Sequence, residues 1–388
     1  MKYNFDEIIP RRGTNSYKWD SAPKADMLPM WVADMDFRTA PAVQEALRQR
    51  VEHGIFGYTH VPQAYFEAAI HWFQRRHNWT IKKDWMLYTS GVVPALSAII
   101  KALTTPGDRI VLQTPVYNCF FSSVRNNGCE AVFNPLLREG ATYRIDFDDL
   151  ERKVSDPRVR LMLLCNPHNP VGRVWKREEL ERIGDLCLRN GVTVISDEIH
   201  CELTYPGHDY TPFASLSTEF RQHSVTCVSP TKAFNLAGLQ IANIIVDNPE
   251  WKKRIDKAIN INEVCDVNPF GVVATIAAYN HGEEWLDELR TYLYDNFRYM
   301  QDFCRKQMPQ FPITDLEGTY LVWMDCSVLG KTSEELEELL KEKARLWLNA
   351  GSMYGSELEG FMRWNIACPR AVLADGLERF RSFVQNFA

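Results

Sequence analysis

The sequence predicts an α/β protein with a large domain, built on a mostly parallel central sheet with helices on both faces, and a smaller α+β domain. Three observations favour this class. Between about residues 84 and 247, short apolar runs alternate with amphipathic stretches, which is the element order of parallel sheets. These runs are apolar and β-branched at both odd and even positions, as expected for strands buried on both faces. After residue 282 the pattern changes to helices separated by single strands.

The composition agrees with a large globular protein and excludes other classes. The 388 residues are 45% hydrophobic and 24% charged, which allows two or three domains. The net charge of −6 gives no reason to expect a nucleic-acid partner. The longest apolar runs, 92–100 and 270–279, fall short of the ~20 residues that span a bilayer, so no membrane partner is expected. Residues 1–13 lack the apolar segment of a secretory signal.

The cysteines and histidines argue against disulfides and metal. None of the ten cysteines forms a C-x-x-C pair, so we expect reduced, mostly buried thiols in a cytoplasmic protein. The nine histidines contain no H-E-x-x-H pattern, and no metal site is expected.

The first predicted helix follows an irregular stretch of 38 residues. It begins near Thr39 as N-cap, carries Pro41 in its first turn and ends at Gly54, in agreement with helix-capping preferences. Its expected apolar face comprises Val43, Ala46, Leu47 and Val51.

The sheet region begins with a strand at 85–89 and a helix at 95–103. The further strand candidates are Asp108–Gln113, Glu130–Asn134, Val159–Cys165, Val192–Ser196, Ser224–Ser229 and Ile241–Val246. An amphipathic helix at 176–190, ending at Gly191, separates two of them.

The second domain is expected to begin with a long helix. The elements predicted there are a helix at 283–307, a strand at 320–324, a helix at 334–343, a strand at 361–366 and a closing helix. The predicted organisation is an N-terminal segment, residues 1–45, that packs with the small domain, a large domain, 46–282, and the small domain, 283–388.

Ligands of open parallel sheets bind at the carboxyl ends of the strands, and two polar loops follow predicted strands. Residues 90–94 (SGVVP) open a helix, whose free N–H groups could bind a phosphate, although a plain turn would look the same. Residues 166–172 (NPHNPVG) contain two Asn-Pro steps. Such a stiff loop could aim a side-chain amide or serve only as a turn.

Two charged residues also follow predicted strands. Asp197 follows a buried strand and needs a partner, which could be a protonated ring nitrogen, a helix N-terminus or a salt bridge. Lys232 comes with two hydroxyl residues, Ser229 and Thr231, and could form a Schiff base or be an exposed loop lysine. A phosphate cradle, an amide, a buried acid and a lysine at successive strand ends together predict a pyridoxal-phosphate site.

The chain resembles fold-type I pyridoxal-phosphate enzymes of the class I/II aminotransferase superfamily, and within them the MalY/PatB family of cystathionine β-lyases (cysteine-S-conjugate β-lyases). The matching stretches are RRGTNSYKWD (11–20), WVADMDF (31–37), FGYT (56–59), SGVVPAL (90–96), TPVYN (114–118), NPHNPVGRVW (166–175), SDEIH (196–200), SPTKAFNLAGLQ (229–240), GTYLVW (318–323) and GFMRWNIACP (360–369). Two positions depart from the aminotransferase pattern. His200 stands where a Tyr is usual, and Gln240 where an Arg is usual.

The resemblance implies the roles of the reactive residues. Lys232 would hold pyridoxal 5'-phosphate as a Schiff base and act as the base, Asp197 would pair with the pyridinium nitrogen, and Tyr117 would stack on the ring. Asn169 would bind the ring hydroxyl and lie beside the substrate, and Arg363 would bind the substrate carboxylate.

The resemblance also implies the remaining contacts to the cofactor. The residues expected at the phosphate and ring are Gly91, Val92, Val93, Ser229, Thr231 and His200. Tyr58 would reach the cofactor and substrate of the neighbouring subunit, so that a homodimer forms the working unit.

The implied activity is α,β-elimination from a small amino-acid substrate, with L-cystathionine giving homocysteine, pyruvate and ammonia. Two alternatives remain: an aminotransferase on the same scaffold, and a regulatory binding protein without catalysis.

Overall fold

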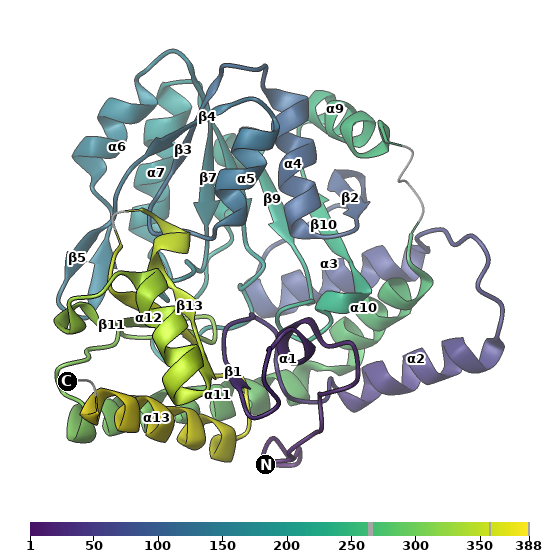
Figure 1. Cartoon of the computed structure of the whole chain (residues 1–388). Coiled ribbons are helices and arrows are strands. Elements are labelled where there is room, and N and C mark those ends of the chain that lie inside the picture. Colours follow the sequence, from purple (N-terminus) through teal and green to yellow (C-terminus); the bar gives the residue numbers. More distant parts are fainter. Residues whose placement is uncertain (263–266, 357, 387–388) are drawn as a thin grey trace.

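A seven-stranded sheet forms the centre of the molecule in the computed structural model, which describes residues 1–262, 267–356 and 358–386 (Figure 1). Its strand order is β2-β10-β9-β8-β7-β3-β4. The strands are β2 (Met86–Thr89), β3 (Arg109–Leu112), β4 (Glu130–Phe133), β7 (Val159–Cys165), β8 (Thr193–Asp197), β9 (Ser224–Val228) and β10 (Ala242–Ile245). All neighbours are parallel except β10, which is antiparallel to both β9 and β2. The mostly parallel sheet is confirmed.

Helices cover both faces of this sheet, as predicted. On one face, α4 (Val92–Leu103), α5 (Cys119–Asn126) and α9 (Pro249–Asn260) share a core with Leu161 and Leu163 of β7. On the other face, α6 (Phe147–Val154) and α7 (Arg177–Arg189) share a core with Met162 and Leu164. Successive residues of β7 point to opposite faces, which explains why this strand has apolar residues at both odd and even positions.

The C-terminal part contains a three-stranded antiparallel sheet of order β11-β14-β13. Its elements are α11 (Glu283–Gln307), β11 (Leu321–Asp325), α12 (Ser333–Leu339), β12 (Leu346–Trp347), β13 (Asn349–Ala350), β14 (Phe361–Asn365) and α13 (Arg370–Gln385). In Figure 1 this yellow-green part lies below the carboxyl edge of the large sheet.

The remaining α-helices and strands belong to neither of the two groups above. They are α1 (Tyr17–Asp20), β1 (Leu28–Pro29), α2 (Pro41–His53), α3 (Gln63–His77), β5 (Leu137–Glu139), β6 (Thr142–Arg144), α8 (Thr218–Gln222) and α10 (Pro269–His281). Strand β1 pairs in parallel with β12, which supports the prediction that the N-terminal segment packs with the C-terminal part. The predicted boundaries at 45/46 and 282/283 stay a prediction.

Four sequence-based expectations differ from the structure. The N-cap of α2 is Ala40 rather than Thr39 and makes no side-chain capping bond. Val51 is 55% exposed, so the apolar face of α2 is shorter than expected. Helix α4 begins at Val92 instead of residue 95. Strand β4 has no fully buried residue, because it lies at the edge of the sheet and has a neighbouring strand on one side only.

None of the helices in the described ranges combines the length and the apolar character needed to cross a bilayer.

Candidate active site

Asp197 is the last residue of β8 and lies buried, at 4% exposure, at the carboxyl edge of the sheet. Its Oδ1 accepts a hydrogen bond from the Ile199 N–H at 3.1 Å. Within the described residues it forms no ion pair with a basic side chain. Burial raises the pKa of Asp197 to about 7, because a charge is costly in a medium of low polarity. The carboxylate therefore suits a cationic ligand atom.

Lys232 lies four residues beyond the end of β9, on the same edge of the sheet. Its Nζ donates a hydrogen bond to the carbonyl of Ala33 at 2.6 Å. Burial, and then the positive charge of Arg363, lower the pKa of Lys232 to about 8. A lysine in this range supplies a neutral, nucleophilic amine near physiological pH.

This low pKa predicts that Lys232 reacts faster with an aldehyde than other lysines do when the protein holds no ligand. The neutral amine is the reactive form, so its labelling should rise through pH ~8, whereas exposed lysines rise near ~10.4. Reductive methylation at pH 6 to 10, followed by peptide mass mapping, measures each lysine separately. A midpoint for Lys232 equal to that of exposed Lys101 would contradict the expectation.

The N-terminus of α4 and two hydroxyl groups are the parts of the chain expected to bind a phosphate, and this role stays a prediction. The N-cap Gly91 makes no side-chain capping bond, so the first N–H groups, those of Val92 and Val93, stay available to an anion. A Cβ on Gly91 would come within 3.3 Å of Pro94 Cδ. Strand β2, which precedes this helix, runs in the same direction as β9, because both strands are antiparallel to β10, which lies between them.

The hydroxyl groups come from the loop that follows β9. Ser229 Oγ and Thr231 Oγ1 are 2.8 Å apart, and Ser229 Oγ also donates to the carbonyl of Ile241 at 2.6 Å. Both residues are buried, at 3% and 7% exposure. Because Ser229 Oγ gives its single proton to Ile241, Thr231 Oγ1 is the donor in the contact between the two hydroxyl groups. These contacts hold the loop in place.

Arg363, on β14, is buried and only partly paired. Its Nη1 donates to Asn169 Oδ1 at 3.2 Å and its Nη2 to the carbonyl of Trp31 at 2.7 Å. The Nε has no hydrogen-bond partner in the described chain, and the guanidinium lies 5.0 Å from the centre of the Tyr354 ring. A buried guanidinium with a free donor is suited to a carboxylate ligand.

Tyr117 and His200 complete the group that the sequence predicted. Tyr117 is half-buried, and burial raises its pKa, with Asp197 and Arg363 both close enough to influence it. His200 is 4% exposed, its Nδ1 has no partner among the described residues, and its ring meets the Tyr320 ring edge-on at 6.0 Å. Burial, aided by Lys232 and Arg363, lowers the pKa of His200 to about 3, so the ring is neutral.

Tyr58 is the only predicted site residue that is exposed in the single chain. It is 96% exposed, on the segment between α2 and α3. Its predicted role depends on a second subunit and stays a prediction.

The sequence did not reveal the part played by residues 31–35. The carbonyl of Ala33 accepts from Lys232 and also from the Tyr320 hydroxyl at 2.9 Å. The stretch WVADMDF stood out in the sequence, but main-chain carbonyls leave no signature in residue type.

A second cluster of polar residues lies outside this site. His77, Cys201 and Glu202 bring their ligand-type atoms within 4.8 Å of one another. However, His77 Nε2 contacts Glu202 Oε1 directly at 2.7 Å, and Arg76 lies 3.5 Å from the other oxygen. The contacts are those of a buried ion pair rather than of ligands arranged around a cation.

The candidate site contains a lysine with a lowered pKa, a buried acid, the N-terminus of α4 and a buried guanidinium with an unpaired Nε. The chemistry of this donor set fits pyridoxal phosphate, whose marks are a lysine Schiff base and an acidic partner for its ring nitrogen. Two groups in the structure agree with such a ligand. The Arg363 Nε has no hydrogen-bond acceptor and the buried Asp197 carboxylate has no cationic partner within the described chain.

Comparisons with known proteins agree with the resemblance seen in the sequence. The chain is 45% identical to the cystathionine beta-lyase PatB of Bacillus subtilis, over 98% of this chain and 99% of that protein. The structure of cystalysin from Treponema denticola, which contains pyridoxal 5'-phosphate, superposes with a TM-score of 0.97 at 34% identity, covering 100% of both chains. A PLP-bound C-S lyase from Staphylococcus hominis superposes with a TM-score of 0.92 at 36% identity, covering 99% of this chain and 98% of that one.

The predicted family and the fold-type I architecture are thereby confirmed. Residues 25–380 match the family described as Aminotransferase class I and II, and the chain belongs to this family.

Proposed function

We propose that this protein is a pyridoxal-phosphate-dependent carbon–sulfur β-lyase, which converts L-cystathionine or a related cysteine conjugate to a thiol, pyruvate and ammonia. The observation that carries the proposal is the convergence of Lys232, Asp197 and Arg363 at the carboxyl edge of the sheet. The full-length similarity to PatB at 45% identity supports the lyase reaction.

The residues of the site divide the binding of the cofactor among them. Lys232 would hold it covalently, and the N-terminus of α4 with Ser229 and Thr231 would bind its phosphate. Asp197 would hold the proton on its ring nitrogen, and Tyr117 and His200 would pack against the ring. When bound, the cofactor supplies an electron sink that stabilises negative charge at the substrate Cα.

Two side chains act on the substrate directly. Arg363 binds the carboxylate and orients the Cα–H bond, with Asn169 fixing the guanidinium from the side. Lys232, once its amine is free, takes the proton from Cα, because its lowered pKa of about 8 leaves a large share of the amine neutral near pH 8. Loss of the sulfur from Cβ releases the thiol, and hydrolysis of the remaining three-carbon fragment gives pyruvate and ammonia.

The test is incubation of the loaded enzyme with L-cystathionine in the absence of any keto acid. The lyase should release homocysteine and pyruvate in equal amounts. If no pyruvate forms and the amino group instead passes to an added 2-keto acid, the aminotransferase alternative holds. If neither product forms with any cysteine conjugate, the regulatory alternative gains.

A homodimer is part of the proposal. Three apolar side chains of the segment 55–58 are exposed in the single chain: Ile55 at 67%, Phe56 at 55% and Tyr58 at 96%. Exposed aromatic groups on one segment are typical of an interface. Sedimentation equilibrium should give twice the chain mass of 44.9 kDa, and Tyr58→Asp should weaken both the dimer and the cofactor affinity; a fully active monomer would contradict this.

We also place the protein in the cytoplasm as a proposal. The nine described cysteines are free thiols, eight of them buried; the tenth, Cys265, lies outside the described residues.

A further inference from the structure

The main chain of residues 31–35 is held by side chains along its whole length. Each of its five carbonyls accepts at least one side-chain hydrogen bond. The donors are Arg363 and Asn349 for Trp31, Asn365 for Val32, Lys232 and Tyr320 for Ala33, Asn365 for Asp34, and Arg11 and Asn235 for Met35. Such complete pairing leaves this segment a single conformation, because every carbonyl would lose a partner if it turned.

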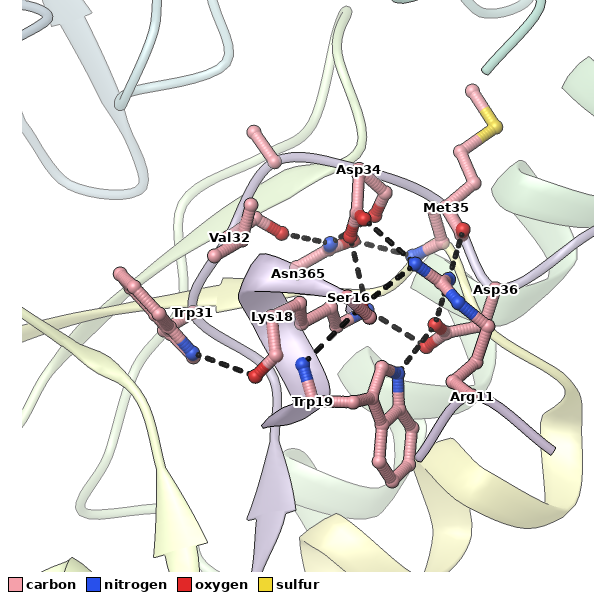
Figure 2. A network of polar contacts seen from close by, with 12 residues as sticks. Arg11, Ser16, Lys18, Trp19, Trp31, Val32, Asp34, Met35, Asp36 and Asn365 are labelled. Carbon is pink, nitrogen blue, oxygen red and sulfur yellow. Dashed lines mark hydrogen bonds and ion pairs between the residues drawn. The ribbon is translucent and has the colours of Figure 1, made fainter. Parts of the chain in front are cut away.

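Asn365 makes the central contact. Its Nδ2 donates to the carbonyls of Val32 at 2.5 Å and Asp34 at 2.6 Å, on either side of Ala33 (Figure 2). Its Oδ1 accepts from the Ala367 N–H at 2.8 Å, which fixes the direction of the amide group. The side chain is 1% exposed, so water does not replace these bonds.

Strand β14 places this amide beside the carboxylate clamp. Arg363 and Asn365 are two residues apart on one strand and point to the same face. Both reach the same segment, Arg363 at Trp31 and Asn365 at Val32 and Asp34. One strand therefore aligns the segment and the substrate-binding guanidinium together.

Buried ion pairs hold the segment from its other side. Lys18 Nζ lies 2.7 Å from Asp36 Oδ2, and Arg11 contacts Asp34 at 3.0 Å and Asp36 at 2.8 Å (Figure 2). Lys18 is 1% exposed. These pairs anchor the end of the segment but touch neither Lys232 nor Arg363. Tyr320 holds the Ala33 carbonyl itself, and Asn365 holds the carbonyls on either side of it.

We propose that Asn365 is a positioning residue, which aims the amine of Lys232 and the guanidinium of Arg363 through the carbonyls of residues 31–34. This inference rests on the proposed function. Because Ala33 lies between the two carbonyls that Asn365 holds, rotation of either peptide would turn the Ala33 carbonyl away from Lys232 Nζ. The amine must stand beside the substrate Cα to take its proton, and a displacement of ~1 Å can cost a factor of about 100 in rate.

The test uses Asn365→Asp with Asn296→Asp as its matched control. The carboxylate keeps the shape of the side chain but loses both donations. Asn296 is equally buried and bridges two carbonyls in the same way, those of Ile366 and Cys368, at 3.0 and 2.9 Å. It donates nothing to residues 31–35. Asn365→Asp should lower kcat about 10- to 100-fold and raise KM for L-cystathionine. Asn296 Oδ1 accepts from Arg370 Nε at 2.7 Å, so an Asp there would be paired with a cation, and Asn296→Asp should leave kcat and KM unchanged.

A binding measurement separates this inference from the proposed function. L-Alanine has the amine and the carboxylate but no leaving group at Cβ, so its displacement of Lys232 is read from the visible absorbance of the bound cofactor without elimination. Asn365→Asp should raise the apparent dissociation constant for L-alanine about tenfold or more. A wild-type protein that binds L-alanine but eliminates no thiol would refute the lyase and still allow this comparison.

Two results would overturn the inference: unchanged kcat and L-alanine affinity in Asn365→Asp, or an equal loss of both in Asn296→Asp. If the buried carboxylate prevents folding, Asn365→Ala and Asn296→Ala supply the same comparison without a charge.

Discussion

Lys232→Ala should abolish thiol and pyruvate release, with a loss of at least about 10⁴-fold in kcat. The substitution removes both the covalent attachment and the base that takes the Cα proton, and a positioned base alone contributes about 10²–10⁴. The amine is held 2.6 Å from the Ala33 carbonyl, with its pKa lowered to about 8. Among the described side chains, only the Tyr320 hydroxyl also donates to the Ala33 carbonyl. Burial raises the pKa of Tyr320, so this phenol is a poor replacement for the amine as the base.

Borohydride trapping tests the same residue without turnover. Reduction of the loaded wild type should fix the cofactor to the peptide that contains Lys232, and the variant should yield no labelled peptide. Lys101→Ala, an exposed position on α4, serves as the control and should keep both the label and the rate. A label on another lysine, or release of pyruvate by Lys232→Ala within about tenfold of the wild type, would refute the assignment.

The edge of the sheet where the site lies could be predicted because buried parallel strands have a clear sequence pattern. The apolar runs that correspond to β7, β8 and β9 end at the polar residues Asn166, Asp197 and Ser229. A polar residue at the end of an apolar run is conspicuous, since burial would otherwise be costly. The sequence alone therefore placed Lys232 and Asp197 at the ends of strands that the structure shows, and their roles stay a prediction.

The main-chain half of the site could not be predicted. The contact between Lys232 and Ala33 joins residues 199 positions apart, and that between Asn365 and Val32 joins residues 333 apart. Both acceptors are carbonyls, which every residue possesses, so neither periodicity nor composition distinguishes them. The prediction of helix ends failed for a different reason. Helix α2 begins with Pro41 after an N-cap, Ala40, that makes no side-chain capping bond, so the hydroxyl of Thr39 wrongly indicated the N-cap.

Asp197→Asn should slow elimination by about 30- to 5,000-fold while leaving the cofactor attached. This range corresponds to about 2–5 kcal/mol of lost transition-state stabilisation, the scale of a buried ion pair that loses one partner. The amide keeps the shape of the side chain and can still accept the Ile199 N–H, but it carries no negative charge to hold a proton on the ring nitrogen. Lys232, Ser229 and Thr231 are unchanged, so attachment persists and only the capacity to stabilise charge at Cα falls.

The combination of retained attachment and lost rate distinguishes Asp197 from Lys232. Borohydride labelling of Asp197→Asn should match the wild type, and its absorbance spectrum should show a shift toward the unprotonated ring. Asp185→Asn, an exposed acid on α7, should change neither quantity. A variant at Asp197 with normal kcat would mean that the ring nitrogen needs no anion, and the burial of this carboxylate, which raises its pKa to about 7, would then have to be explained by folding alone.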